Sequence, residues 1–409
     1  MRRVVIIGGG AAGLMAAAQL EASNAIIIEK NNRVARKVMI TGKGRCNVTN
    51  NCDENSLIAN VPGNGKFLYS AFSAFNSKDT MHFFEQNGVP LKTERGNRVF
   101  PVSDKAVDIV DALHRAAKRN AKIIEGTAKE ILIENGAVSG VLLSSGDVIG
   151  CDAVILATGG KSYPLTGSTG DGYAMAEKLG HTITDIKPAL VPLTIHEGFC
   201  EKLSGLSLKN VTFSVFEKDK KKPVFSEMGE MLFTHFGISG PLVLSASAHL
   251  RHIGKKEYIA KIDLKPALSV EQLEKRVLSD FSERLNCDFI NSLDALLPKN
   301  LIPVVVKLSG IEPRAKVNSI TKEQRQNLVG VLKGLTLHIV GTRPIEEAII
   351  TRGGISVKEI NPSTMESKLI KNLYFAGEVI DADAYTGGFN LQIAFSTGYL
   401  AAKSVEEKL

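Results

Sequence analysis

Hydrophobic and polar positions divide the 409-residue chain into strand-like and helix-like segments. Short, continuous apolar runs are typical of buried strands, and they occur at residues 4–7, 25–28, 153–157 and 373–376. Helix-like spacing and composition predict helices at residues 11–20, 66–87, 104–120, 173–179 and 391–402. Alternating segments with turns at Asn135-Gly136 and Gly146 predict a β-meander of strands 122–124, 130–134, 138–144 and 148–149.

The pattern changes near residue 188. Residues 190–265 are β-rich, with predicted strands near 191–195, 211–216, 231–233 and 258–264. Residues 269–335 are helical, with apolar residues at helical spacing in 270–285 and 322–335. We therefore expect one inserted unit with a β part and a helical part.

The first apolar strand leads directly into a glycine motif. Gly8, Gly10 and Gly13 have the G-x-G-x-x-G spacing, and a small-residue helix follows. Gly8 permits a tight turn, Gly10 lets the backbone approach a pyrophosphate, and Gly13 lets helix and strand pack closely. The second strand ends in Glu29, where a carboxylate accepts a hydrogen bond from an adenosine ribose and repels a 2′-phosphate. This stretch predicts a Rossmann-like βαβ unit that binds the adenosine half of FAD or NAD rather than NADP.

A polar, glycine-bearing segment, residues 31–50, follows this unit. It carries Lys37, Lys43 and Arg45, so it is suited to line the phosphates and the reactive end of a dinucleotide. The alternative is a solvated loop. Gly42 and Gly44 favour cofactor contact, because glycine permits a close backbone approach.

Two later segments end in turns of the same kind. The apolar strand 153–157 is followed by Thr158-Gly159-Gly160, a sequence that returns the chain to the cofactor in FAD proteins, and Asp171 opens the next helix. Near the C-terminal end, Gly387 and Gly388 precede a helix. The free N–H groups of its first turn would suit the flavin O2 side, where negative charge collects on reduction.

Composition narrows the class of protein. The five cysteines are scattered without a C-x-x-C pair, which favours a reducing, cytoplasmic compartment and argues against a flavin dithiol reductase. No apolar run reaches membrane-spanning length. The net charge of +7 favours anionic ligands, and the lysine cluster at 218–222 is interpreted as a solvated hairpin tip.

With these pieces in place, the sequence resembles the bacterial YhiN/BaiN-type NAD(P)/FAD-dependent oxidoreductases nearly end to end. The most specific segments are residues 41–50 (TGKGRCNVTN), 233–241 (FTHFGISGP) and 377–392 (GEVIDADAYTGGFNLQ). The chain departs from the family pattern at two positions: Lys43 and Ala35 stand where glycine is usual. More distantly, the sequence resembles the fumarate reductase flavoproteins, which share the A-T-G-G strand end and the T-G-D-G turn.

The resemblance implies a fold and a reaction class. The fold class is α/β: a Rossmann-like FAD-binding domain with a β-meander, plus an inserted β-barrel-like part and a small helical bundle. We place the FAD domain at 1–189 and 341–409, the β-rich part at 190–267 and the helical bundle at 268–340. The activity is expected to be FAD-dependent reduction of an activated C=C or similar bond of a small molecule, either anionic or neutral.

Three residues are candidates for chemistry at the flavin. Arg45 would stabilise charge on the reduced flavin or grip an anionic substrate, with a phosphate contact or a loop salt bridge as the alternative. His235 and Tyr385 are candidate proton donors, with a buried, satisfied histidine and a tyrosine packed beside the cofactor as the alternatives. Arg45 would lower the pKa of the neighbouring Cys46 thiol and make it reactive. The alternative, which we favour, is that Cys46 packs near the flavin.

Non-covalent FAD is thus the expected cofactor. The residues expected to contact it come from the glycine turns, the polar loop, the meander and the C-terminal segment: Gly8, Gly10, Ala11, Ala12, Gly13, Glu29, Lys30, Lys37, Thr41, Gly42, Gly44, Arg45, Cys46, Asn47, Ala128, Ala157, Thr158, Gly159, Gly160, Asp171, Gly377, Glu378, Gly387, Gly388, Asn390, Leu391 and Gln392. No metal site is expected.

The sequence is compatible with several electron donors and several kinds of partner. There is no second G-x-G-x-x-G, so NADH or NADPH would act as a transient donor without a domain of its own, and a protein or quinol is the other possibility. We expect a small-molecule substrate and no stable nucleic acid partner. The competing hypotheses are a flavoprotein of tRNA modification, which the basic balance allows, and a partner protein with structural or sensory FAD. The sequence does not select an oligomeric state.

Overall fold

The computed structural model describes residues 3–21 and 24–408. The chain forms two compact units. Unit 1 comprises Met1–Ala189 and Ile345–Leu409, and unit 2 comprises Leu190–Pro344. Each unit has its own hydrophobic core.

Unit 1 is built on a five-stranded sheet in the order β19-β10-β1-β2-β6, with all pairs parallel. The apolar runs of the sequence form these strands because both faces are covered. Ile6 pairs with Ile155 on one side and with Ile27 on the other. The bounds are β1 (Arg3–Ile7), β2 (Asn24–Glu29), β6 (Ala121–Glu125), β10 (Ala153–Leu156) and β19 (Leu373–Phe375).

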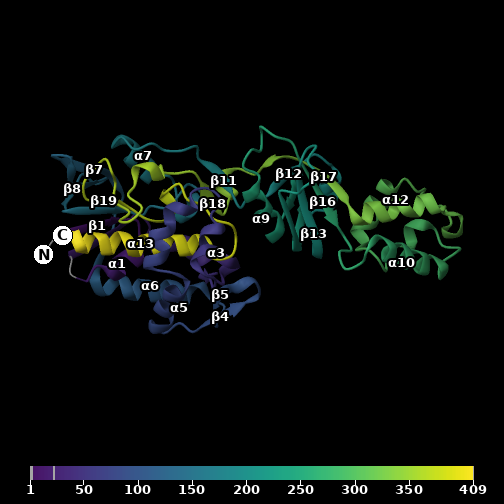
Figure 1. Ribbon diagram of the computed structural model, residues 1–409, viewed down its shortest axis with the longest axis horizontal. Helices are drawn as coiled ribbons and strands as arrows, with labels where there is room; N and C mark the ends of the chain where they lie inside the picture. Colours follow the sequence, from purple (N-terminus) through teal and green to yellow (C-terminus); the bar gives the residue numbers. More distant parts are fainter. Residues whose placement is uncertain (1–2, 22–23, 409) are drawn as a thin grey trace. The chain divides into compact units, whose positions relative to one another are not determined.

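Three helices of this unit pack together: α1 (Ala11–Gln19), α6 (Ala106–Asn120) and α13 (Phe389–Lys408). Figure 1 shows α13, from the C-terminal end of the chain, beside α1 from the N-terminal end. Small residues allow this approach, since a Cβ on Gly398 would lie 2.4 Å from the Ala12 carbonyl oxygen. The two ends of the sequence therefore build one domain.

The β-meander forms a separate antiparallel sheet of β7 (Ala128–Glu134), β8 (Ala137–Leu143) and β9 (Val148–Gly150). The prediction that strand 122–124 opens this meander is wrong. That segment is β6, which pairs in parallel with β2 in the main sheet, Ile27 opposite Ile123. Its short apolar pattern fits either position, and only the parallel pairing decides between them.

The remaining elements of unit 1 surround this framework. The predicted helix 66–87 is interrupted, because Asn76 is extended and caps a new helix by accepting from the N–H groups of Lys78 and Asp79. These elements are α2 (Arg36–Ile40), α3 (Glu54–Ala59), α4 (Tyr69–Ala74), α5 (Ser77–Gln86), α7 (Asp171–Lys178), the sheet β3 (Thr49–Asn50), β5 (Arg98–Pro101) and β4 (Leu91–Glu94), and the pair β11 (Lys187–Ala189) and β18 (Ile350–Arg352).

Unit 2 contains a closed six-stranded barrel in the order β12-β15-β14-β13-β16-β17. The strands are β12 (Leu193–Ile195), β13 (Ser207–Glu217), β14 (Phe225–Thr234), β15 (Gly237–Ser239), β16 (Tyr258–Asp263) and β17 (Leu335–Thr342). The helices α8 (Phe199–Lys202), α9 (Pro241–His249), α10 (Val270–Ser282), α11 (Ile302–Ser309) and α12 (Lys322–Lys333) complete the unit. The barrel and the longer helices share one core.

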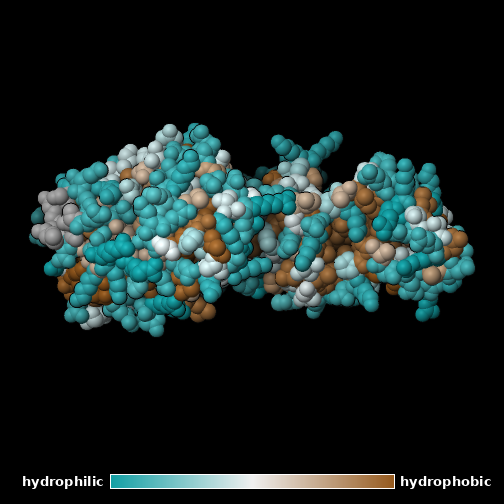
Figure 2. Space-filling view, turned by 90° about the horizontal axis from the view of Figure 1, so that it is seen from below, coloured by the Kyte–Doolittle hydropathy of each residue, from teal (hydrophilic) through white to brown (hydrophobic). Residues whose placement is uncertain are grey.

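The predicted helix 322–335 extends too far. It ends at Lys333, and β17 begins at Leu335 with alternating buried and more exposed residues. The proposed boundary of the helical bundle at residue 340 therefore falls inside a barrel strand. The α/β class with a Rossmann-like domain and an inserted barrel is confirmed. Among the described residues, no helix is long and apolar enough to cross a membrane, and Figure 2 shows that hydrophilic residues predominate on the face in view.

Candidate functional site

The glycine turn between β1 and α1 has the geometry of an anion site. A Cβ on Gly13 would lie 1.9 Å from the Gly8 carbonyl oxygen, so no side chain fits there. At Gly10, in contrast, no heavy atom lies within 4 Å of the Cβ position, which leaves open space. No side chain caps the start of α1, so the N–H groups of its first turn face this space without a side-chain acceptor.

Glu29 at the end of β2 holds the same turn in place. Its Oε2 accepts a hydrogen bond from the Gly9 N–H at 2.8 Å, and its Oε1 accepts from the backbone and side chain of Asn31 at 2.8 and 2.7 Å. A carboxylate has about four acceptor positions, so one position is left for a ribose hydroxyl. The neighbouring Lys30 does not point to a phosphate: its ammonium pairs with Asp171 and Thr169 at the start of α7.

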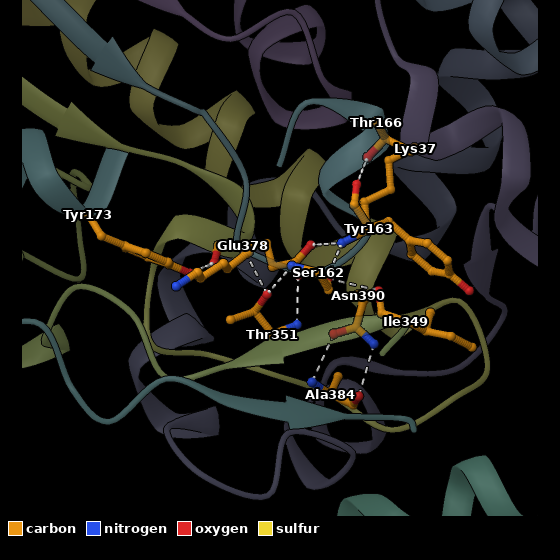
Figure 3. Close-up of polar contacts among 11 residues, drawn as sticks. Lys37, Ser162, Tyr163, Thr166, Tyr173, Ile349, Thr351, Glu378, Ala384 and Asn390 are labelled. Atoms are coloured by element: carbon orange, nitrogen blue, oxygen red, sulfur yellow. Dashed lines mark hydrogen bonds and ion pairs between the residues drawn. The ribbon is translucent and has the colours of Figure 1, made fainter. Parts of the chain in front are cut away.

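A second polar cluster forms around Glu378 (Figure 3). Glu378 Oε2 lies 2.7 Å from the Lys37 ammonium, and Oε1 accepts from the Thr351 N–H at 2.8 Å and from the Ser162 hydroxyl at 3.1 Å. The Lys37 ammonium also donates to Ser162 Oγ at 2.7 Å. Residues of α2, the segment after β10, β18 and the segment after β19 therefore meet at one charged group.

Glycines after β10 make room for this cluster. A Cβ on Gly160 would lie 2.3 Å from Thr351 Oγ1, which accepts from the backbone N–H groups of Lys161 and Ser162. Gly159 is left-handed, with φ of 74°. Ala157 precedes this turn at the end of the main-sheet strand, and Ala128 begins β7 of the meander.

The loop after α2 contains several left-handed residues. Gly42 and Gly44 have φ of 57° and 83°, and between them Lys43 has φ of 59°. Ala35, just before α2, has φ of 52°. The two positions where the chain departs from the glycine-rich family pattern are thus positions where glycine would be less strained.

Arg45 is held by carboxylates of its own domain. Its guanidinium donates to Asp104 Oδ1 at 2.6 and 2.9 Å and to Glu94 Oε1 at 2.5 Å, and it lies 4.2 Å from the centre of the Phe100 ring. These hydrogen bonds raise the pKa of Arg45 above its ordinary value. Two carboxylates already pair with the charge that would grip an anion, and a catalytic role for Arg45 stays a prediction. The loop salt bridge is the role that the structure supports.

Cys46 follows with its side chain fully buried. Burial raises the pKa of its thiol to about 12, so it remains protonated at neutral pH. This supports the packing role. Thr41 lies at the start of the loop, where its hydroxyl donates to the Val38 carbonyl oxygen at 2.7 Å.

The C-terminal glycine turn lies against this loop. A Cβ on Gly388 would be 2.4 Å from the Thr49 carbonyl oxygen, and Asn50 Nδ2 donates to the Gly387 carbonyl oxygen at 3.1 Å. Gly377 is left-handed, and its Cβ position lies 2.9 Å from Ala12 Cβ in α1. The three predicted glycine turns are thus joined within unit 1, as the sequence pattern indicates.

Two predicted cofactor ligands in this segment have other partners. The Asn390 amide closes the preceding loop, accepting from the Ala384 N–H and donating to its carbonyl oxygen, both at 2.9 Å. Gln392 is fully buried and bonds to Thr49, Thr80, Ser396 and the Phe75 carbonyl oxygen. These bonds use its side chain, which corrects its assignment as a cofactor ligand. Leu391, between them, is partly buried.

The two candidate proton donors lie in different units. Tyr385 is partly exposed in the loop before Gly387, where its N–H donates to the Asn60 carbonyl oxygen at 3.0 Å. His235 is exposed in the turn between β14 and β15 of the barrel, edge-on to Phe236. The alternative of a buried histidine is therefore wrong for His235.

Asn47 Oδ1 and Thr158 Oγ1 are among the buried polar atoms of unit 1 that have no hydrogen-bond partner in the described structure. Both residues were expected at the cofactor. Buried polar atoms are normally satisfied, so these atoms fit a site that a ligand completes. Together with the open space at Gly10, they support a dinucleotide along the carboxyl edge of the sheet. Among the described residues, no group of three or more metal-ligating side chains occurs.

Ser162, Thr351 and Tyr173 belong to the Glu378 cluster and were not predicted. Tyr173 donates to the Glu378 carbonyl oxygen at 3.4 Å, and burial raises the pKa of its phenol. Thr351 lies 189 positions after Ser162 in the sequence, and no spacing rule joins them. The only local signal is the Gly353-Gly354 pair that follows β18.

A family model, the Rossmann domain of HI0933-like proteins, matches residues 2–404. The chain belongs to the HI0933-like family. This family consists of flavin-dependent oxidoreductases, so the resemblance, the enzyme class and the flavoprotein assignment are confirmed. The HI0933-like chain is 32% identical over 418 residues to the 3-dehydro-bile acid delta(4,6)-reductase of Clostridium scindens, covering 100% of both chains.

Two further comparisons concern a second sequence relative and a solved structure. The chain is 32% identical over 413 residues to the ribosomal RNA dihydrouridine synthase of Haemophilus influenzae, covering 99% of this chain and 98% of that protein. It also resembles the FrdA chain of Escherichia coli quinol fumarate reductase, with a TM-score of 0.51, 16% identity, and coverage of 99% of this chain and 71% of that chain. The last likeness shows a shared fold.

Proposed function

We propose that this protein binds FAD without a covalent link and reduces a C=C bond that is conjugated to a carbonyl group. The observation that carries the proposal is the meeting, within unit 1, of three glycine turns from distant parts of the chain beside buried polar atoms without partners. Both relatives at 32% identity have names that describe reduction of such a bond. When bound, FAD would supply the hydride from N5.

The residues of unit 1 have distinct proposed roles. The N–H groups in the first turn of α1 would donate hydrogen bonds to the pyrophosphate, and Glu29 would accept one from the ribose at its remaining acceptor position. Lys37 and Glu378 would fix the polar middle of the dinucleotide. The first helical hydrogen bond of α13 runs from the Gln392 backbone N–H to the Gly388 carbonyl oxygen. The N–H groups before Gln392 have no partner within the helix, and they would face the flavin O2 side.

Tyr385 and His235 are the two candidates for the proton donor to the substrate carbon that does not receive hydride. Each carries a proton on an oxygen or nitrogen suited to general acid catalysis. We expect flavin reduction to be unchanged in both Tyr385→Phe and His235→Gln. Substrate turnover should fall by about 10²-fold in whichever of the two variants has lost the true proton donor. Unchanged turnover in both variants would reject these assignments while leaving the FAD site intact.

NADH or NADPH is the proposed transient donor, entering without a domain of its own, and the reducing cytoplasm is the proposed compartment. Anaerobic titration tests the donor, because a competent donor bleaches the flavin absorption. A flavin that bleaches with neither nucleotide would direct the search to protein or quinol donors.

Gly10→Glu tests the FAD site. The Cβ position has no neighbour within 4 Å, so the new carboxylate would enter the proposed pyrophosphate space without displacing protein atoms. We expect the variant to fold and to lose FAD. Gly330→Glu in α12 is the matched control, because its Cβ position is equally open and it should retain FAD. Stoichiometric FAD in Gly10→Glu would remove the basis of the proposal.

An RNA uracil is a second candidate for the reduced group. Its C5=C6 bond is conjugated to a carbonyl, and the Haemophilus influenzae relative is named as a ribosomal RNA dihydrouridine synthase. The charge distribution also favours this candidate over a neutral small molecule: unit 2 carries 22 basic and 16 acidic residues, whereas unit 1 carries 28 and 27. Dihydrouridine formed in RNA, but no reduction of small enones, would select it.

A further inference from the structure

The positive charge of the protein is concentrated in the inserted unit. Unit 2 has a net charge of +6 and unit 1 of +1, although unit 1 is much the larger. The proposed FAD site lies in unit 1, so it does not explain the excess positive charge of unit 2. Such a local excess of lysine and arginine is the electrostatic footprint of a polyanion site.

Within unit 2, the barrel brings two basic loops to the same end. The hairpin between β13 and β14 includes residues 217–222, and the loop between α9 and β16 includes residues 251–257. Glu217 pairs with Tyr258 in the β13–β16 register, so the two loops are neighbours. Ion pairs confirm the contact: Lys218 Nζ lies 2.5 Å from Glu257 and Lys256 Nζ lies 2.9 Å from Glu217.

These two loops, which we call the lysine end, hold seven basic and three acidic residues. Two of the acidic residues are already paired, to Lys218 and Lys256. The side chains of Lys220, Lys221, Lys222 and Lys255 are exposed, and no ion pair involves them in the described part of the chain. The lysine end therefore contributes +4 of the +6 charge of unit 2.

The chemistry of the lysine end favours a phosphate backbone over other partners. None of the exposed large hydrophobic residues lies in either loop, so the surface lacks the apolar side chains of a membrane-inserting face and of a protein interface core. Lysine ammonium groups bind phosphates as point charges without reading bases. This suits a surface that positions RNA while another site selects the nucleotide.

We propose that the lysine end of the barrel binds the phosphate backbone of RNA. This inference rests on RNA as the substrate, the second candidate above. It assigns substrate positioning to a surface of unit 2, separate from the flavin residues of unit 1. The solvated hairpin tip expected from the sequence becomes a binding element once the neighbouring loop joins it.

The test compares two triple variants of the full, FAD-loaded chain. One is K220Q/K221Q/K222Q. The other is the matched control K299Q/K307Q/K322Q, which removes three exposed lysines from the helical part of the same unit. The measurement is the binding of a fluorescein-labelled 20-nucleotide RNA of mixed sequence, by anisotropy, between 50 and 300 mM KCl. NADH bleaching of the flavin is recorded for each protein.

We expect the hairpin variant to bind at least ~10-fold more weakly at low salt and the slope of log K against log salt to fall by about 2, as for the loss of three phosphate contacts. The control should bind within about twofold of the parent. Equal loss in both variants, or loss in neither, overturns the proposal.

A membrane is the alternative partner. If binding to vesicles with 30% phosphatidylglycerol depends on the hairpin lysines while RNA binding does not, the proposal is overturned in favour of a membrane. Loss of flavin or of bleaching in the parent protein would count against the FAD enzyme and leave the RNA result readable.

Discussion

The Lys37 ammonium lies 2.7 Å from a carboxylate oxygen of Glu378, although 341 positions separate the two residues in the sequence. Both side chains are about four-fifths buried, with exposed fractions of 21% and 19%. The pair joins α2, near the N-terminal end, to the segment after β19, and it lies beside Ser162 and Thr351 (Figure 3). It is therefore a charged link between the two segments of the chain that build unit 1.

Glu378→Gln should destabilise the protein by about 2 kcal/mol, because it leaves a largely buried ammonium without a counter-charge. In the double variant with Lys37→Met the loss should be smaller than the sum of the single losses, since the two residues interact directly. Urea unfolding of the three variants measures this coupling. Lys187→Met, which breaks an exposed pair with Asp185, should change stability by less than about 0.5 kcal/mol. Additive losses at Lys37 and Glu378 would show that the pair is not coupled.

Lys43→Gly and Ala35→Gly should each stabilise the protein by about 1 kcal/mol. Both residues are left-handed, with φ of 59° and 52°, and glycine removes the clash of the Cβ atom in this conformation. Thermal unfolding detects the change. Ala174→Gly is the control: this residue is exposed inside α7, so glycine should cost about 1 kcal/mol. A loss of stability at all three positions would contradict the strain argument.

Gln392→Ala should cost about 3 kcal/mol. The side chain is fully buried, and its removal leaves a cavity and takes away the acceptor of the Thr49 and Thr80 hydroxyl groups. Because Thr49 packs on Gly388, FAD affinity should fall as well. Gln86→Ala, at an exposed position of α5, should change stability by less than about 0.5 kcal/mol. A similarly small effect at Gln392 would mean that the network adds little.

His181 should make stability fall at mildly acidic pH. Its ring is buried beside Phe375, with Nε2 2.8 Å from Ser367 Oγ, and burial lowers its pKa below the ordinary value of 6.5. The unfolded chain then binds more protons than the folded chain between these two values. Stability is full above pH 6.5 and declines as the pH falls towards the lowered value.

The measurement is the unfolding free energy at pH 7.5 and pH 5.5 for the parent and His181→Gln. The difference between the two pH values should be smaller in the variant, because only the parent chain gains a proton on His181 when it unfolds at pH 5.5. Equal pH dependence in both proteins would show that His181 does not titrate across this range.

The sequence by itself determined the Rossmann-like unit and the family. Four continuous apolar runs became four parallel strands, because a strand covered on both faces needs no polar positions. Gly8 and Gly13 could be recognised for the same local reason, since strand, turn and helix are contiguous there and no side chain fits between them. The motif segments 41–50 and 377–392 identified the family because they are long and specific.

The tertiary structure alone decided which partners those residues have. Arg45 has the charge to bind an anion, but the fold places Glu94 and Asp104 beside it. Gln392 is next to a predicted cofactor turn, yet its side-chain oxygen accepts hydrogen bonds from Thr49 and Thr80. Strand β6 joins the main sheet rather than the meander, and Ser162 bonds to Thr351, although the inserted unit separates the two residues in the sequence. These outcomes depend on contacts between residues far apart in the chain, and local periodicity carries no information about such contacts.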